Sequence, residues 1–255
     1  MPKKLKRSVF LLDVDNTLLD NDRFIADLKH HLKQECGHRR AMEYWAFLEE
    51  IQAELGYDDY LGALQRYHNV HDHDPHVLEV SRFILDYPFD ERLFPHAREV
   101  VRRFKKWGKV VILSDGDVVF QPRKIELAGL YKAVDGQVLI YTHKEQEIDD
   151  VKERYPADHY IVIDDRPDIL ATFKKRWRSH ATTVLIGQQS PAKKENHTCL
   201  DTDLRVACIG DLLQSGMDEH LAPRVKLKPN GPFPSGRREK PPKRRRSTHG
   251  KYHVV

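Results

Sequence analysis

Cysteine and long apolar runs are scarce in this chain of 255 residues. The three cysteines, Cys36, Cys199 and Cys208, are far apart and form no CxxC pair, which predicts reduced, structural thiols rather than disulfides or a zinc site. The apolar runs are only a few residues long, as in residues 9–12, which excludes a transmembrane helix. The basic start of the chain precedes too short an apolar stretch for a secretory signal. We therefore expect a cytoplasmic protein with no membrane partner.

Charge is divided unevenly along the chain. From Arg224 onward, eleven Lys or Arg residues stand against one acid, Glu239, which gives this stretch a charge of +10. Since the whole chain carries +4, the first 223 residues carry −6. Residues 229–250 are also rich in Pro and Gly, a composition that cannot bury enough apolar surface to fold alone. The sequence thus predicts an acidic folded core and a disordered basic tail over residues 216–255.

Three short apolar runs end in oxygen-bearing side chains. Residues 9–12 lead into Asp13, residues 110–113 into Ser114 and Asp115, and residues 160–163 into Asp164 and Asp165. Continuous aliphatic runs without polar alternation are typical of strands that are buried on both faces, as in a parallel sheet. We therefore interpret the three runs as parallel strands.

Helical patterns alternate with these strands. Further strands are expected at residues 138–141 and 183–186, and helices at residues 96–107, 124–130 and 145–154. Alternating strands and helices predict an α/β core built on a doubly wound, Rossmann-like parallel sheet. In such sheets ligands bind beyond the carboxyl ends of the strands, so the polar residues that end the three runs are candidates for a functional site.

The stretch between the first two strands is different. Helical patterns fill it at residues 23–35, 39–55, 58–67 and 75–87, with no strand between them. We expect an inserted α-helical cap domain at residues 22–88, with residues 1–21 and 89–215 forming the catalytic core.

Residues 13–19, DVDNTLL, place two carboxylates two residues apart directly after a buried strand. This segment resembles the first motif, Asp-x-Asp-x-Thr, of the haloacid dehalogenase-like (HAD) superfamily. The other motifs of that superfamily are matched in the same order by Ser114, Lys144 and the pair Asp164-Asp165. The resemblance covers residues 8–20 and 88–186, and it implies a HAD-like hydrolase of the phosphatase type with a helical cap.

Asp13 and Asp15 are the candidate catalytic residues. The carboxylate of Asp13 is ionised at neutral pH, so it can attack phosphorus without a base and form an aspartyl-phosphate. Asp15 would protonate the leaving alcohol and then take a proton from the attacking water. A phosphate cannot approach two aspartates without a cation, and the oxygen ligands suit Mg²⁺. The resemblance implies the metal ligands Asp13, the backbone carbonyl of Asp15, and Asp165, with Asp164 behind them and Asp168 as a further candidate.

A phosphate-binding set completes the predicted site. The Ser114 hydroxyl and the backbone N–H groups of Asp115 and Gly116 would hydrogen-bond the phosphoryl oxygens, and Lys144 would neutralise their charge. Lys144 follows a predicted strand and precedes Asp165 by 21 residues. Lys124 is the competing candidate for this lysine.

Two other polar segments have simpler interpretations. Asp20, Asn21 and Asp22 follow the first motif, where relatives have a mobile flap, but a polar turn explains them better. Residues 68–76 hold four His and two Asp and are compatible with a transition-metal site. Their spacing matches no zinc pattern, so we favour a surface loop.

The sequence therefore predicts a Mg²⁺-dependent phosphatase for a small phosphorylated metabolite. A phosphomutase or another phosphotransferase would keep the same residues. A 2-haloacid dehalogenase fits less well, because that chemistry needs neither a metal nor the acid at Asp15. A nucleic-acid-binding protein, acting without sequence preference through the basic residues 237–246, is the alternative from another class, although a solvated tail is the favoured interpretation.

Overall fold

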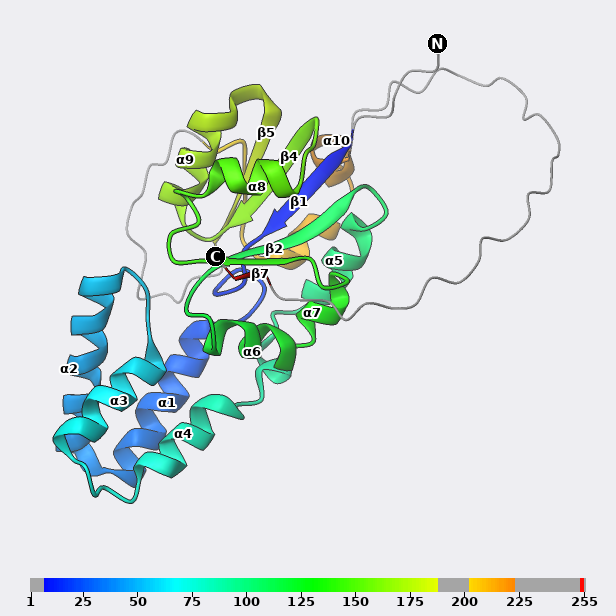
Figure 1. Ribbon diagram of the computed structural model, residues 1–255. Helices are drawn as coiled ribbons and strands as arrows, with labels where there is room; N and C mark the ends of the chain where they lie inside the picture. Colours follow the sequence, from blue (N-terminus) through cyan, green and yellow to red (C-terminus); the bar gives the residue numbers. More distant parts are fainter. Residues whose placement is uncertain (1–6, 188–201, 223–252, 255) are drawn as a thin grey trace, which may run out of the picture.

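The computed structural model describes residues 7–187, 202–222 and 253–254 (Figure 1). In this part of the chain a seven-stranded sheet has the strand order β6-β5-β4-β1-β2-β3-β7, and every hydrogen-bonded strand pair is parallel. The strands are β1 (Ser8–Leu12), β2 (Lys109–Asp115), β3 (Val138–Tyr141), β4 (His159–Asp164), β5 (Ala181–Ile186), β6 (Leu204–Val206) and β7 (His253–Val254). The predicted doubly wound α/β core is confirmed.

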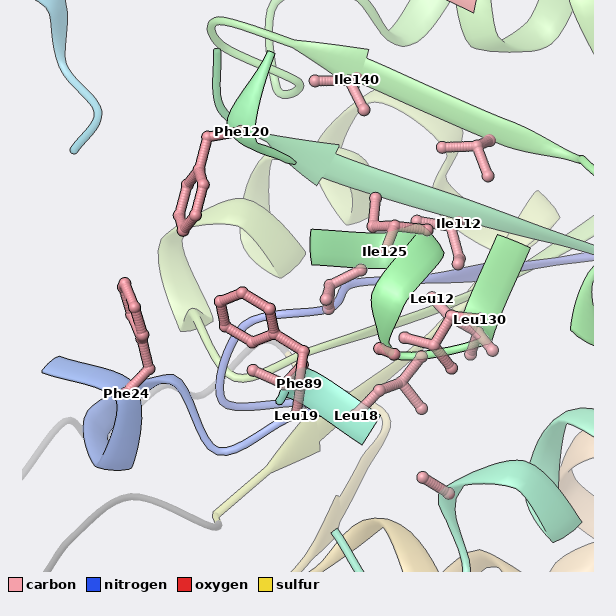
Figure 2. Packing of buried hydrophobic residues seen from close by; sticks show 14 of the residues in the cluster. Leu12, Leu18, Leu19, Phe24, Phe89, Ile112, Phe120, Ile125, Leu130 and Ile140 are labelled. Atoms are coloured by element: carbon pink, nitrogen blue, oxygen red, sulfur yellow. The ribbon is translucent and has the colours of Figure 1, made fainter. Parts of the chain in front are cut away.

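Both faces of the sheet are buried. Odd and even positions of β1 point to opposite faces, so Phe10 and Leu12 enter one apolar cluster and Val9 and Leu11 the other. Figure 2 shows Leu12, Ile112 and Ile140 of neighbouring strands in the first cluster, together with Ile125 and Leu130 from helices. This two-sided burial explains why the strands lack polar alternation.

Helices of the core cover these two faces. One face carries α5 (Ala97–Phe104), α6 (Phe120–Leu127), α7 (Leu130–Ala133) and, beyond the short helix η4 (Ile209–Leu213), α10 (Met217–Leu221). The other face carries α8 (Ile148–Arg154) and α9 (Pro167–Trp177).

The boundaries of α6 and α8 differ from the prediction. Helix α6 begins four residues early, because the carboxylate of Asp117 accepts hydrogen bonds from the N–H groups of Val119 and Phe120. Helix α8 begins three residues late, since residues 143–147 form turns in which Gln146 N–H donates to the His143 carbonyl.

Four helices lie between β1 and α5, as the sequence predicts: α1 (Asn21–Glu35), α2 (Gly37–Leu55), α3 (Tyr60–Val70) and α4 (Val77–Leu85). In Figure 1 they stand together beside the carboxyl ends of the strands. A ring cluster connects them to the core, because Phe24 of α1 packs against Tyr60, Phe89 and Phe120. We call α1–α4 the inserted helices; their division from the core as a cap domain stays a prediction.

Most of the predicted tail lies outside the described residues, including the basic run at 237–246. Within that stretch, α10 and β7 are described, and Leu221 of α10 is buried against the core. Cys199 and the sequence that surrounds it also lie outside the described residues. None of the described helices is both long and apolar enough to cross a bilayer.

Candidate active site

The carboxyl ends of neighbouring parallel strands bring the predicted residues together. Asp13 follows β1, Ser114 and Asp115 end β2, and Asp164 ends β4, and these three strands are adjacent in the sheet. A cavity of about 280 Å³ opens there. On the sheet side it is lined by Asp13, Asp15, Ser114, Asp115, Gly116, Lys124, Lys144 and Asp165. On the opposite side it is lined by Gln52 of α2, Tyr60 of α3, and Gly56, Tyr57 and Asp58 of the loop between these two helices.

The turn after β1 is fixed by its own polar groups. Asn16 adopts a left-handed backbone conformation with φ 58°, and its side-chain oxygen accepts hydrogen bonds from the N–H groups of Asn21 and Asp22. Asp20 caps α1 by accepting from Arg23 N–H at 2.9 Å. Asp20 and Asp22 therefore shape the turn, as predicted, whereas Asn21 lines the cavity.

Lys144 lies between two buried carboxylates. Its Nζ is 2.6 Å from an Asp13 oxygen and 2.7 Å from an Asp164 oxygen, and its side chain is 2% exposed. Burial alone would lower the pKa of Lys144, but these carboxylates raise it above its ordinary value. Burial raises the pKa of Asp13 to about 7 although Lys144 opposes the shift.

Three acids form a buried cluster at the same place. Asp13, Asp164 and Asp165 each bring a ligand oxygen to within 4.8 Å of the others. The two oxygens of Asp164 are engaged by Lys144 Nζ and by the N–H of Arg166 at 2.9 Å. Asp168 is outside this cluster, because its 66% exposed carboxylate pairs with the Arg166 guanidinium.

The loop after β2 differs in part from the prediction. The N–H of Gly116, predicted to bind phosphate, donates to the Tyr141 carbonyl at 3.0 Å, because the β2–β3 pairing ends with Asp115 opposite Tyr141 and this hydrogen bond closes it. The Asp115 carboxylate accepts from Lys144 N–H at 2.7 Å and thereby positions that lysine. Ser114 lies in the cavity, where its hydroxyl contacts the Gln121 amide at 2.9 Å.

The two candidate lysines have different partners. Lys144 meets Asp13, whereas Lys124 Nζ lies 2.9 Å from both oxygens of Asp15 and 3.0 Å from the Asn21 side-chain oxygen. Gln121, which the sequence analysis did not single out, donates to Asp15 at 3.0 Å. Its only sequence signal is a position three residues before Lys124, which puts both side chains on one face of α6.

The histidine-rich segment lies apart from the cavity. His71 contacts Glu43 at 2.7 Å, and His76 contacts Asp74 at 2.6 Å. Cys36 joins His76 and Asp74 in a group whose ligand atoms lie within 4.8 Å of one another. The Asp74 carboxylate is already held by Tyr67 and Arg40, which agrees with a structural role for this segment.

A family model described as haloacid dehalogenase-like hydrolase matches residues 8–175, a span that contains every predicted site residue. The chain belongs to the haloacid dehalogenase-like hydrolase family. The resemblance seen in the motifs is thereby confirmed, and with it the assignment of the protein as a HAD-like hydrolase. A search of the curated proteins found no match.

Solved structures agree with this family. A crystal structure described as a haloacid dehalogenase-like hydrolase from Burkholderia xenovorans LB400 is 48% identical and has a TM-score of 0.75, over 81% of this chain and 97% of that one. The HAD-hydrolase YfnB from Bacillus subtilis, solved bound to magnesium, is 11% identical with a TM-score of 0.57, over 86% and 99%. A dehalogenase solved with an intermediate complex is 15% identical with a TM-score of 0.56, over 88% and 100%. The last two show a shared fold alone.

Proposed function

We propose that this HAD-like hydrolase is a Mg²⁺-dependent phosphatase that hydrolyses a small phosphomonoester through an aspartyl-phosphate on Asp13. The observation that carries the proposal is the second carboxylate, because Asp15 lines the same cavity as Asp13. Phosphoryl transfer to Asp13 needs a proton donor for the leaving alcohol and a proton acceptor for the water that follows. Dehalogenation has no use for this second acid.

The acidic cluster fits a hard divalent cation. Mg²⁺ prefers oxygen ligands, and Asp13 and Asp165 supply them from within the buried cluster. Asp164 is engaged by Lys144 and by a backbone N–H, so we place it behind the ion, with the backbone carbonyl of Asp15 as a further ligand. When bound, Mg²⁺ supplies the positive charge that offsets repulsion between the phosphate and these acids.

The chain's own residues account for both chemical steps. First an Asp13 oxygen bonds to phosphorus, the bond to the leaving oxygen breaks, and Asp15 protonates that oxygen. Water then attacks the phosphorus, Asp15 takes its proton, and inorganic phosphate leaves Asp13. Lys144 and Ser114 line the same cavity as Asp13, so a cation and a hydroxyl are available to stabilise the negative charge that develops on the phosphoryl group.

The cavity also limits the substrate. Its volume of about 280 Å³ lies just below the usual range of ligand pockets, and Tyr57 and Tyr60 of the inserted segment line it opposite the sheet. This size favours a small phosphorylated metabolite over a macromolecule.

Hydrolysis of 4-nitrophenyl phosphate tests the proposal. We expect release of nitrophenol that needs Mg²⁺ and is abolished in Asp13→Asn, which keeps the shape of the side chain and removes the nucleophile. Asp149→Asn is the matched control, because its 72% exposed side chain pairs with Arg176 away from the cavity. Activity that survives in Asp13→Asn or in the absence of metal would refute the proposal. Nitrophenol released in excess of inorganic phosphate would identify a phosphotransferase instead.

A further inference from the structure

Lys124 is a buried cation that the proposed chemistry does not use. The residue is 1% exposed, and its Nζ lies 5.2–5.8 Å from the ring centroids of Phe24, Phe89 and Phe120. Figure 2 shows these three rings near one another. A buried ammonium group is costly unless opposite charge and hydrogen bonds compensate it, so its partners determine where it can lie.

Those partners are the catalytic acid and the first turn of α1. The Lys124 ammonium group contacts both oxygens of Asp15 at 2.9 Å and the Asn21 side-chain oxygen at 3.0 Å. An ammonium group has three donors, and these three contacts occupy them. The Asp15 side chain stays 30% exposed, and it lines the cavity.

Gln121 extends the arrangement to the phosphate side of the site. Its amide donates to Asp15 at 3.0 Å and to the Ser114 hydroxyl at 2.9 Å. Two residues of α6 therefore hold the Asp15 carboxylate. Lys124 does so through its charge, and Gln121 through an amide that also donates to Ser114. Side chains held by such partners keep the orientation that proton transfer requires.

We propose that Lys124 is a positioning residue that orients the Asp15 carboxylate for proton transfer and ties it to the first turn of α1. This inference rests on the proposed function. The groups around Lys124 come from α1, from the return of the chain to the core at η1 (Phe89–Arg92), and from α6. Any movement of α1 against α6 thus changes the contacts of Lys124, and Asp15 responds with it.

The test compares two leaving groups. Phenol, like the tyrosine side chain, has a pKa of about 10, so the departing phenolate needs a proton. The 4-nitrophenolate anion is a weaker base and needs a proton less. The ratio kcat/KM reports the steps up to formation of the aspartyl-phosphate. We expect Lys124→Met to lower kcat/KM about 100-fold with phenyl phosphate and about threefold with 4-nitrophenyl phosphate.

Lys174→Met is the matched control, because Lys174 pairs with Asp203 and does not line the active-site cavity. The Lys174→Met variant should keep the wild-type kcat/KM with both phenyl phosphate and 4-nitrophenyl phosphate. An equal loss of kcat/KM with both substrates would show that Lys124 acts only through the stability of the fold. An increase in kcat/KM would show that Lys124 holds Asp15 in an orientation that hinders proton transfer. Either result overturns the inference.

Hydrogen exchange gives a second test that requires no turnover. Asp15→Asn and Lys124→Met should both speed amide exchange in the first turn of α1, and Asn21→Ala should do so while leaving the Asp15–Lys124 pair intact. Unchanged exchange in all three variants overturns the tie to α1. If the wild-type protein hydrolyses neither phosphate, the proposed function fails while the exchange experiment still decides the structural tie.

Discussion

At Asp13 a proton and the proposed Mg²⁺ would compete for one buried carboxylate. Burial raises its pKa from the ordinary value of 3.8 to about 7, and Lys144 only partly opposes this shift. Because the folded state holds this proton more tightly than the unfolded chain, Asp13 stabilises the metal-free protein at low pH, and the contribution is lost as the pH rises through about 7. A carboxylate that ligates Mg²⁺ must lose its proton.

We therefore expect the Mg²⁺ affinity to depend on pH. Below about pH 7 the affinity should rise roughly tenfold for each pH unit, and above it should level off. Titration calorimetry in buffers of different ionisation enthalpy measures both the affinity and the protons released. Asp168→Asn should leave this dependence unchanged, because Asp168 lies outside the acidic cluster. An affinity that is constant across this range would refute the assignment of Asp13 as a ligand.

Lys144 should differ from Lys124 in its dependence on the leaving group. It contacts Asp13 and Asp164 rather than Asp15, so in the proposed mechanism it would balance the charge of the transferring phosphoryl group. We expect Lys144→Met to lower kcat/KM at least about 100-fold with both phenyl and 4-nitrophenyl phosphate. Lys144→Arg keeps the charge and should lose less. A selective loss with phenyl phosphate would reverse the roles of the two lysines.

For single residues, the sequence predicted the position of a side chain best where that residue ends a strand. Asp13, Ser114 and Asp165 could be predicted because parallel strands bring their carboxyl ends to one edge. The partner of Lys124 could not be predicted, since it depends on how α6 is rotated about its axis. The N–H of Gly116 was assigned to phosphate, but the length of the β2–β3 pairing decides its partner, and the sequence does not reveal that length.

Among the elements, the end of α2 approaches the core at Gly56. This residue has φ 82°, and a Cβ at this position would lie 2.3 Å from the ring of His143, the neighbour of Lys144. Both Gly56 and Lys144 line the cavity. The contact thus joins the end of α2 to the loop that carries Lys144.

Gly56→Ala should disturb this contact. We expect kcat/KM to fall about tenfold, because the added methyl displaces His143 and with it Lys144. Gly37→Ala is the matched control, since Gly37 has φ 79° and no atom within 4 Å of the Cβ position. Both variants should lose roughly 1–2 kcal/mol of stability, because each forces a residue with a Cβ into a left-handed conformation, but only Gly56→Ala should lose activity. Failure of His143→Ala to restore activity in the double variant would contradict this account.

Asp74 joins three of the inserted helices. Its buried carboxylate accepts hydrogen bonds from Arg40 of α2, from Tyr67 of α3 and from the N–H of His76 at the start of α4. Burial raises the pKa of Asp74, but these partners outweigh it and lower the pKa to about 2. The ionised form therefore stabilises the fold.

Asp74→Asn should lower the free energy of unfolding by about 2 kcal/mol at neutral pH. The contribution of the ionised carboxylate is complete above the ordinary pKa of 3.8 and is lost as the pH falls through about 2, so the difference between the two proteins should shrink in acid. Urea unfolding at neutral and acidic pH measures this. Asp72→Asn, with a 76% exposed side chain, should be neutral. A difference that does not change with pH would contradict the role of the charge.

Elements were predictable where an apolar pattern was long or unbroken. Strand β3 was predicted at its observed residues, and each of the four inserted helices was predicted to within a few residues. Helix α9 was not singled out, although Pro167 in its first turn is a typical start signal. Strand β6 has three residues of which one is buried, which leaves no pattern to recognise.

In the molecule as a whole, the residues before Arg224 have a negative net charge and those from Arg224 onward a positive one. Deleting residues from Arg224 onward changes the net charge from +4 to −6. The described residues that line the candidate site all precede Arg224, so turnover of 4-nitrophenyl phosphate should stay within about twofold of the wild-type value. Affinity for RNA or DNA that depends on salt, if the full chain has it, should be lost. A large loss of turnover would assign the tail to catalysis.

The pairing of β7 with β3 has a consequence for self-association. Without β7, the outer backbone groups of β3 would form an open sheet edge, and such an edge is a template on which another chain can add a strand. Strand β3 leads directly into the loop that carries Lys144. The last described residues therefore protect the edge beside the active site from aggregation, and the truncated protein should associate with itself as its concentration rises.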